Sequence, residues 1–152
     1  MKYSLHWIRE HLNGELPETN TLVREVTLRA FEVEETEVVG GDTLLEIKVL
    51  PDRAHDALSH RGMAREIGAL LGVARKLHTP KAVPVNSGVS AVRVTIEDST
   101  LCPRYIATRI DGVTVGKTTP EIAKKIEVIG GRSINNIVDI TNLVLFDIGQ
   151  PL

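Results

Sequence analysis

A stretch of chain-breaking residues near the middle of the sequence places the strongest limit on the fold. Residues 79–90 contain prolines, an asparagine, serines and a glycine, a composition that interrupts both helices and strands. We therefore predict a linker at 81–90 that separates a domain of residues 1–80 from a second part, residues 91–152. The second part supplies too few strands and helices for a full core, so we expect it to be an incomplete domain.

The composition is typical of a globular protein. The chain has 152 residues, of which 42% are hydrophobic and 25% charged, and no apolar run is long enough to cross a membrane. The N-terminus lacks the apolar stretch of a signal peptide. Cys102 is the only cysteine, which excludes an intrachain disulfide and a cysteine-bound zinc cluster. We expect a protein of the reducing cytoplasm.

Charge is unevenly distributed, although the net charge is only −2. Residues 1–50 carry 5 basic and 10 acidic side chains, whereas residues 51–85 carry 6 basic and 3 acidic ones. A nearly neutral chain is a poor stand-alone nucleic-acid binder, because counterion release needs a basic face. The middle segment could make a modest phosphate contact, but a solvated helix surface is the simpler explanation of its charges.

The first 80 residues predict a small α+β domain of helices and one hairpin. Leu45, Ile47 and Val49 alternate with charged residues, as in a half-buried strand. This strand is expected to pair with one over residues 31–38 across the turn signal at 40–42. Three helices are expected. The first covers residues 5–12 after the cap Ser4, with Trp7 and His11 on one side. The second runs from Asn20 or Thr21 through Leu28, and the third covers residues 60–71 between Ser59 and Gly72.

The second part predicts strands at 92–96 and 105–110 and two helices. Thr119 followed by Pro120 is a typical helix start, and that helix is expected to end at Ile129. A last helix follows a cap at Asn135 or Asn136. Its expected apolar stripe consists of Ile137, Ile140, Thr141, Val144, Leu145 and Ile148.

Residues 51–61 form the densest polar cluster, and we expect residues 51–58 to be a loop. Adjacent His55 and Asp56 are typical of metal-dependent phosphohydrolases, but such sites need further ligands that the chain hardly supplies. The structural interpretation is stronger. In it Asp56 or Ser59 caps the following helix, and Arg53 holds the loop through carboxylate or carbonyl contacts.

Polar residues also crowd the last predicted helix. Asn136, Asp139 and Asn142 are spaced three apart, so they share one face. That face either meets solvent or lines a polar pocket, and the spacing alone leaves both open.

Several runs of residues closely resemble the bacterial phenylalanyl-tRNA synthetase β subunit, near the start of its tRNA-editing domain. The long run from Gly131 to Asn142, with Asn-Asn-Ile-Val-Asp-Ile-Thr-Asn within it, carries most of this resemblance. The other matching runs are Ser4–Glu10, Leu45–Ile47, Pro51–Arg53, Asp56–Ser59, Ala64–Glu66, Arg104–Tyr105, Ile110–Val113 and Gly149–Pro151. The resemblance covers nearly the whole chain.

The chain departs from that family in three places. Most bacterial members insert an oligonucleotide-binding barrel where this chain has only residues 40–42, so we expect the barrel and its tRNA contact to be absent. Ala30 stands where the family often has glycine, which costs about 1 kcal/mol if that backbone needs positive φ. The sequence ends at Leu152, before the family's His-Ala-Phe-Asp, so we expect a truncated α/β portion of the editing domain.

The resemblance implies a class II, α2β2 enzyme that charges tRNA(Phe) with ATP and Mg²⁺ and edits Tyr-tRNA(Phe). Its aminoacylation site lies on the α subunit, so neither a catalytic residue nor a cofactor or metal site is expected in this chain. Thr141 and Asn142 match positions near the editing pocket and would hydrogen-bond the misacylated tRNA end. The residues expected to have structural or orienting roles are Asp139, Asn136, Asp52, Arg53, Asp56 and Ser59.

Two other hypotheses stay open. The chain could be a stand-alone binding or scaffold module that kept this fold and lost the chemistry. It could also be a small metal-dependent hydrolase that uses His55, Asp56 and His60.

Overall fold

The computed structural model describes residues 1–79, 81 and 92–152, which form two compact units. Met1–His78 and Val115–Leu152 make up the first unit, and Thr79–Thr114 the second. Helices and small antiparallel sheets confirm the α+β class.

The predicted division into residues 1–80, a linker and residues 91–152 stays a prediction. Of the linker at 81–90, only residue 81 is described. Within this chain, contacts join the last two helices to the N-terminal residues, so they are described below as one unit.

An antiparallel sheet forms one side of the first unit. Its strands are β1 (Lys2–Ser4), β4 (Asp42–Ile47) and β3 (Val33–Val39), in the order β1-β4-β3. Gly40 (φ 57°) and Gly41 (φ 82°) close the β3–β4 hairpin, as predicted, because glycine adopts positive φ without strain. Sequence patterns missed β1, which is too short to show a period of its own.

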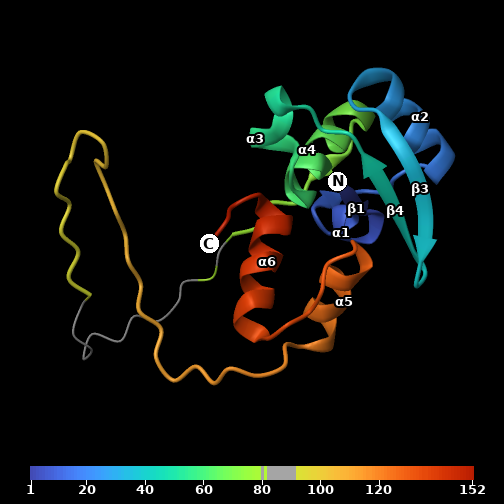
Figure 1. Ribbon diagram of the computed structural model, residues 1–152. Coiled ribbons are helices and arrows are strands. Elements are labelled where there is room, and N and C mark those ends of the chain that lie inside the picture. The colour runs from blue at the N-terminus through green and yellow to red at the C-terminus, as the bar shows by residue number, and fades with distance from the viewer. Residues whose placement is uncertain (80, 82–91) are drawn as a thin grey trace. The chain divides into compact units, whose positions relative to one another are not determined.

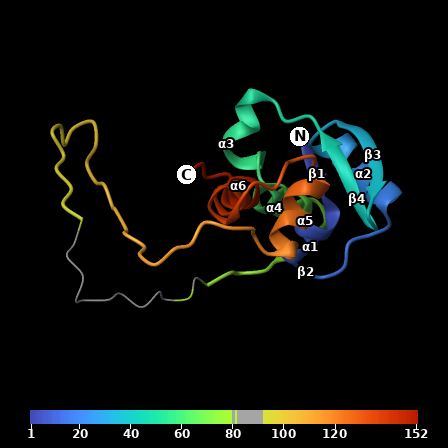
Figure 2. The ribbon, with the colours of Figure 1, turned by 60° about the horizontal axis from the view of Figure 1, so that its bottom comes forward.

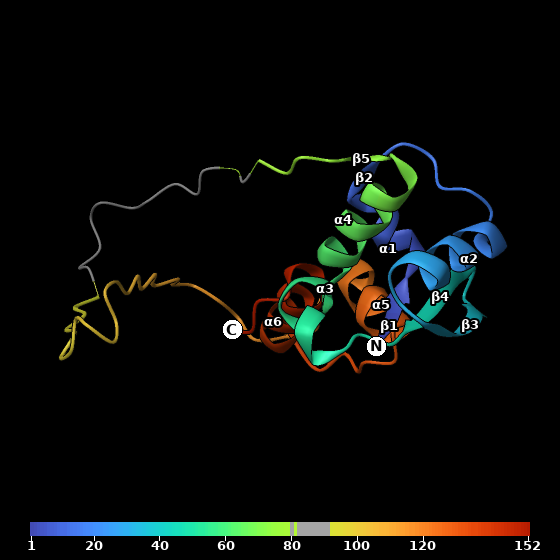
Figure 3. The same cartoon turned by 90° about the horizontal axis from the view of Figure 1, so that it is seen from above.

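Three helices, which pack against this sheet or on one another, complete the core. Helix α1 (Leu5–Glu10) follows β1, α2 (Thr19–Arg29) lies beside β3, and α4 (His60–Leu71) packs on α1 and α2 (Figure 3). The predicted caps Ser4 and Ser59 are confirmed, whereas α2 begins after Glu18 without a side-chain cap. The buried cluster comprises Tyr3, Leu5, Ile8, Leu12, Leu22, Val26, Phe31, Leu45, Ile47, Ala57, Met63, Ala64 and Ile67.

The predicted polar loop at 51–58 is wrong for most of its length. Pro51–Arg53 forms a 3-10 helix and Ala54–Ala57 a short helix, α3. Proline at the first position suits a helix start, and the buried Ala57 anchors α3 on the core. A further small ladder, also missed, pairs β2 (Leu12–Asn13) with β5 (Ala74–Arg75).

The two C-terminal helices were predicted closely. Helix α5 (Pro120–Val128) is capped by Thr119 and helix α6 (Asn136–Ile148) by Asn135. The two lie side by side in Figure 1, and Figure 2 shows α6 almost end-on beside α4.

The expected apolar stripe of α6 is only partly covered. Ile137, Ile140 and Ile148 are 41%, 45% and 45% exposed, while the helix turns Asp139, Phe146 and Asp147 toward the rest of the unit. Polar contacts therefore orient α6 in this chain as much as apolar burial does.

The strands predicted at 92–96 and 105–110 are wrong for the described residues 92–114, which contain neither helix nor strand. Isolated extended segments gain no ladder hydrogen bonds, so apolar alternation without a partner strand does not make a strand. Val92, Val94 and Ile96 are accordingly exposed. Asp98 forms a local turn by accepting hydrogen bonds from the backbone N–H groups of Thr100 and Leu101.

Candidate functional site

The middle of α6 carries the two pocket candidates predicted from the sequence. Thr141 and Asn142 are half-buried neighbours in the same turn. The hydroxyl of Thr141 donates to the backbone carbonyl of Val138 at 2.8 Å, so its lone pairs remain able to accept. An asparagine amide offers both a donor and an acceptor, so this turn can recognise a hydroxyl group.

Asp139 is fully buried and organises the approach to α6. One carboxylate oxygen accepts from the Ser133 hydroxyl at 2.7 Å, and the other accepts from the Ile134 backbone N–H at 2.9 Å. A carboxylate in the first turn also suits the positive end of the helix dipole. These contacts join Asp139 to the residues just before α6, and its orienting role stays a prediction.

The two asparagines that precede Asp139 make different contacts. Asn135 caps α6, because its side-chain oxygen accepts from the backbone N–H groups of Ile137 and Val138, each at 3.0 Å. Asn136 instead exchanges hydrogen bonds with the backbone of Gly116, at 2.8 Å and 3.0 Å. The start of α6 is thus tied to the segment that precedes α5.

The other end of α6 is tied to α1 and α4 by a group of residues that we name the α6 clasp: Trp7, His11, His60, Phe146 and Asp147. A single carboxylate oxygen of Asp147 accepts from the Trp7 indole N–H and lies against His11 Nε2, both at 2.7 Å. Nδ1 of His60 lies 2.8 Å from the Phe146 carbonyl oxygen, to which it donates. Side chains from the α1 region and from α4 therefore contact two consecutive residues of α6.

His60 lies in the centre of the clasp and is fully buried. Its Nε2 accepts from the Ser4 backbone N–H at 3.1 Å, which leaves the proton on Nδ1. Burial lowers the pKa of His60 to about 4, and the hydrogen bond to the Phe146 carbonyl only partly opposes this. His60 is therefore neutral near pH 7, held in one tautomer.

Asp147 keeps its charge although it is half-buried. Burial on its own would raise the pKa of Asp147, but hydrogen bonds from His11 and Trp7 outweigh it and leave that pKa below its usual range. The carboxylate lies close to Nε2 of His11, so that nitrogen carries a proton. The other nitrogen of His11, Nδ1, is buried and has no hydrogen-bond partner in the described residues.

A cavity of about 190 Å³ adjoins the clasp. It is lined by Trp7, Glu10, His11, Arg61, His78, Lys125, Leu143 and Asp147. Lys125 pairs with Glu10, and its ammonium lies 5.2 Å from the centre of the Trp7 ring. Helix α5 thus also contacts the clasp through a charged side chain.

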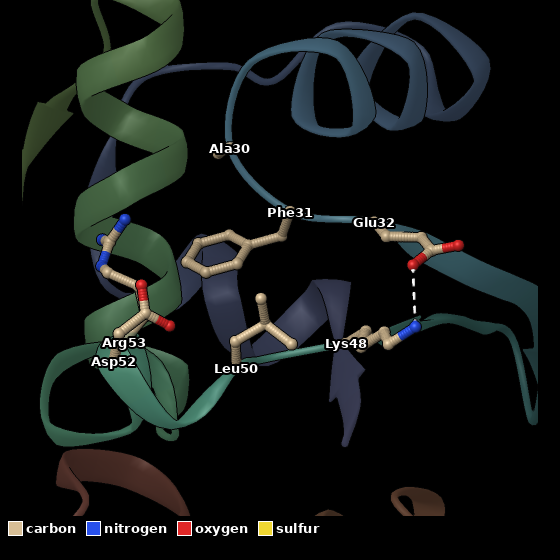
Figure 4. Close-up of a pocket in the computed structure, with 7 residues that line it drawn as sticks. All are labelled: Ala30, Phe31, Glu32, Lys48, Leu50, Asp52 and Arg53. Carbon is tan, nitrogen blue, oxygen red and sulfur yellow. Dashed lines mark hydrogen bonds and ion pairs between the residues drawn. The ribbon is translucent and has the colours of Figure 1, made fainter.

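Arg53 lies beside a larger pocket of about 350 Å³, shown in Figure 4. Its guanidinium makes two hydrogen bonds to Asp56, at 3.1 Å and 2.9 Å, and one to Glu66 at 2.9 Å. It also lies 5.0 Å from the centre of the Phe31 ring. The holding role of Arg53 stays a prediction, and Asp52 beside it is exposed and lines the pocket.

Hydrogen bonding to Arg53 lowers the pKa of Asp56, which also pairs with Arg65 at 2.9 Å. Ser59, not Asp56, caps α4, because its hydroxyl oxygen accepts from the Gly62 backbone N–H at 3.0 Å. The carboxylates of Asp56 and Glu66 are both paired with arginine side chains, and these ion pairs join α3 to α4.

The set His55, Asp56 and His60 is not assembled as a metal site. Both ring nitrogens of His60 are already hydrogen-bonded inside the core, and Asp56 is paired with two arginines. Across residues 1–79, 81 and 92–152, no group of three or more His, Cys, Asp or Glu side chains is placed to hold a metal ion.

Sequence reasoning missed the clasp as a unit. It placed Trp7 and His11 on one helix side, as their spacing of four requires, but it gave them no partner. Asp147 offered one signal. An acidic side chain in the last turn of a helix interacts unfavourably with the helix dipole, which suggests a hydrogen-bond partner on another element.

Comparison with known proteins identifies the relatives of this chain. Residues 101–152 match the B3/4 domain family. The phenylalanine–tRNA ligase beta subunit of Anaeromyxobacter dehalogenans is 46% identical over 114 residues, which cover 73% of this chain and 14% of that subunit. The subunit of the same name from Geobacter metallireducens is 44% identical over 115 residues, again 73% of this chain and 14% of the relative.

The relative from Rhodopirellula baltica, also named phenylalanine–tRNA ligase beta subunit, is 35% identical over 153 aligned residues. This alignment covers 100% of the chain and 22% of the relative, so it leaves no room for a long insertion at the Gly40–Gly41 turn. That relative therefore also lacks a long insertion at this point.

The fold and the matched residues define an α+β chain whose residues 101–152 match a B3/4 domain. The chain belongs to the phenylalanine–tRNA ligase beta subunit family and matches a fragment of that subunit, spanning less than a quarter of the length of these relatives. None of the described helices is both long and apolar enough to cross a bilayer.

Proposed function

We propose that this chain is the N-terminal part of a phenylalanine–tRNA ligase β subunit and that its α6 contributes to the removal of tyrosine from Tyr-tRNA(Phe). The observation that carries this proposal is the position of Thr141 and Asn142. They lie on a helix anchored at both ends, inside the region that matches the B3/4 domain. The proposed setting is a cytoplasmic class II enzyme that charges tRNA(Phe).

The proposed partners are a synthetase α subunit, in an α2β2 heterotetramer, and tRNA(Phe). ATP and Mg²⁺ belong to the aminoacylation site, which we place on the α subunit. This part of the β subunit then serves the enzyme by binding and orienting, a role that agrees with the contacts of Asp56, Asp139 and Asp147 within the chain.

The chemistry proposed for α6 is recognition of the misacylated tRNA end. A tyrosyl ester differs from the correct phenylalanyl ester by one hydroxyl group. A site that hydrogen-bonds that hydroxyl rejects the analogue that lacks it, because its own polar groups would be left unpaired. The Asn142 amide and the lone pairs of the Thr141 hydroxyl are the groups on α6 suited to such bonds.

The test is deacylation of Tyr-tRNA(Phe) by the assembled ligase that contains this chain. We expect Asn142→Ala to slow deacylation roughly tenfold, the effect of losing one hydrogen bond of about 1.4 kcal/mol, and to leave phenylalanine charging unchanged. Thr141→Val, which keeps the shape and removes the hydroxyl, should act in the same direction. Asn20→Ala, which removes an exposed asparagine on α2, is the matched control.

Two results would contradict the proposal. A wild-type ligase that charges tRNA(Phe) but leaves Tyr-tRNA(Phe) intact would remove the editing role altogether. Normal deacylation by both the Asn142 and the Thr141 variants would remove these residues from the site.

A further inference from the structure

We infer that Asp147 is a positioning residue for the editing site: by accepting hydrogen bonds from Trp7 and His11, it sets where Thr141 and Asn142 lie. This inference rests on the proposed function, because it concerns how the α6 site is held. It adds a role for α1, which is distant in sequence and supplies neither pocket candidate.

The first argument is the reach of the contacts. Trp7 and His11 are 140 and 136 residues away from Asp147 in sequence, yet both meet the same carboxylate oxygen at 2.7 Å. The neighbouring Phe146 carbonyl accepts from His60, 86 residues away. Consecutive residues at the end of α6 are thus held from two different helices.

The second argument concerns the choice of an acidic residue at this point. The C-terminal end of a helix carries the negative end of its dipole, so a carboxylate in the last turn is locally unfavourable. Helix formation therefore gives no reason for Asp147. The two donors, Trp7 on α1 and His11 just after it, do give a reason, because a charged acceptor makes stronger hydrogen bonds than a neutral one.

The third argument is that burial alone holds α6 loosely. Ile137 and Ile140, on the part of the helix that also carries Thr141, are 41% and 45% exposed. The polar contacts at the two ends, through Asp139 and Asp147, then determine how far the helix can rotate or slide.

The fourth argument is mechanical. Thr141 lies six residues before Asp147, about 9 Å along the helix axis. An α-helix transmits a rotation at its end over that distance, and misplacing a binding group by about 1 Å can cost roughly a hundredfold in rate. Loss of the Asp147 contacts should therefore appear in the turnover of deacylation.

The test compares Asp147→Ala with Asp147→Asn in the assembled ligase. The asparagine oxygen can still accept from Trp7 and His11, whereas alanine accepts nothing. We expect alanine to lower kcat for Tyr-tRNA(Phe) deacylation about tenfold and asparagine to restore most of that loss, with charging unchanged in both. Glu127→Ala, which removes an exposed carboxylate from α5, is the control.

A spectroscopic signal reports the same contact without any activity. Trp7 is the only tryptophan among these 152 residues, so in a sample of this chain alone its indole N–H resonance and its fluorescence report the bond to Asp147 directly. We expect a shift in Asp147→Ala and a much smaller one in Asp147→Asn. If Asp147→Ala fails to fold, Trp7→Phe takes its place, because it keeps an aromatic ring against His60 and removes only the donor.

The outcomes separate this inference from the proposed function. If the wild-type ligase does not deacylate Tyr-tRNA(Phe), the proposed function fails first. If the wild type is active and Asp147→Ala moves the Trp7 signal but leaves deacylation intact, the positioning role is wrong. Equal loss with asparagine and alanine would also overturn it, because the carboxylate would then act by its charge or its basicity.

Discussion

The imidazole of His60 stacks on the indole of Trp7, with ring centroids 4.0 Å apart and 17° between the ring planes. Both nitrogens of that imidazole are hydrogen-bonded, one to the Ser4 N–H and the other to the Phe146 carbonyl. A neutral histidine in the centre of the core thus joins β1, α1, α4 and α6.

The free energy of unfolding should fall as the pH is lowered from about 6.5 to about 4. Over this range His60 is neutral in the folded chain and protonated in the unfolded chain. Burial lowers its pKa from 6.5 to about 4, so between these values the unfolded chain binds a proton that the folded chain does not. The contribution is fully present above pH 6.5 and is lost toward pH 4, by about 3 kcal/mol in total.

Urea unfolding, repeated at about pH 7.5, 6, 5 and 4.5, measures this loss of stability. Asp56 and Asp147 have pKa values below their usual range, so they contribute at lower pH than His60 does. In His60→Gln the titrating group is gone, and the same pH range should show a much flatter stability curve. A curve as steep as that of the wild type would show that other groups dominate.

Asp139→Ala should destabilise the α5–α6 region by roughly 1–3 kcal/mol. The change leaves the Ile134 N–H and the Ser133 hydroxyl without their buried acceptor. Asp139→Asn, which keeps one acceptor oxygen, should cost less. Hydrogen exchange of the α6 amides measures the effect, and equal exchange rates in the wild type and Asp139→Ala would refute the orienting role.

Gly62→Ala should be far more harmful than Gly41→Ala. A Cβ on Gly62 would overlap the backbone carbonyl oxygen of Asp56, whereas one on Gly41 would meet nothing within 4 Å. The Gly41 variant carries only the strain of its positive φ, about 1 kcal/mol, while overpacking against backbone costs about 1–3 kcal/mol or more. Thermal unfolding of the two single variants compares them, and a reversed order would contradict the close packing of α4 on α3.

Tyr3→Phe should lower stability by about 1–2 kcal/mol. The phenol of Tyr3 is fully buried and donates to the Ala57 carbonyl at 2.8 Å, so its loss removes one buried hydrogen bond and leaves that carbonyl with only the Ser59 N–H as a donor. Burial also raises the pKa of Tyr3 well above its ordinary value, so the hydroxyl stays protonated. A Tyr105→Phe control changes a phenol that is 64% exposed and should have no measurable effect.

Local rules account for the parts of the fold that the sequence predicted well. Ser4, Ser59 and Thr119 cap helices in the structure as their side chains suggest, because an N-cap depends only on residues within one turn. The hairpin turn at Gly40–Gly41 follows for the same reason.

The sequence also determined the family, through a long run of specific residues that lies on α6 and just before it. It placed Thr141 and Asn142 on one turn of that helix, and their role in editing stays a prediction. It did not show that β1 would become a third strand, because strand pairing depends on residues forty or more positions away.

Only the tertiary structure decided how α6 is held and what the N-terminal helix contributes to it. Helical spacing put Trp7 and His11 on one face, but no pattern could name Asp147, 136 and 140 residues away, as their shared acceptor. The same limit explains the strands wrongly predicted at 92–96 and 105–110. Apolar alternation shows that a segment could form a strand, whereas the presence of a partner strand is decided only in the folded chain.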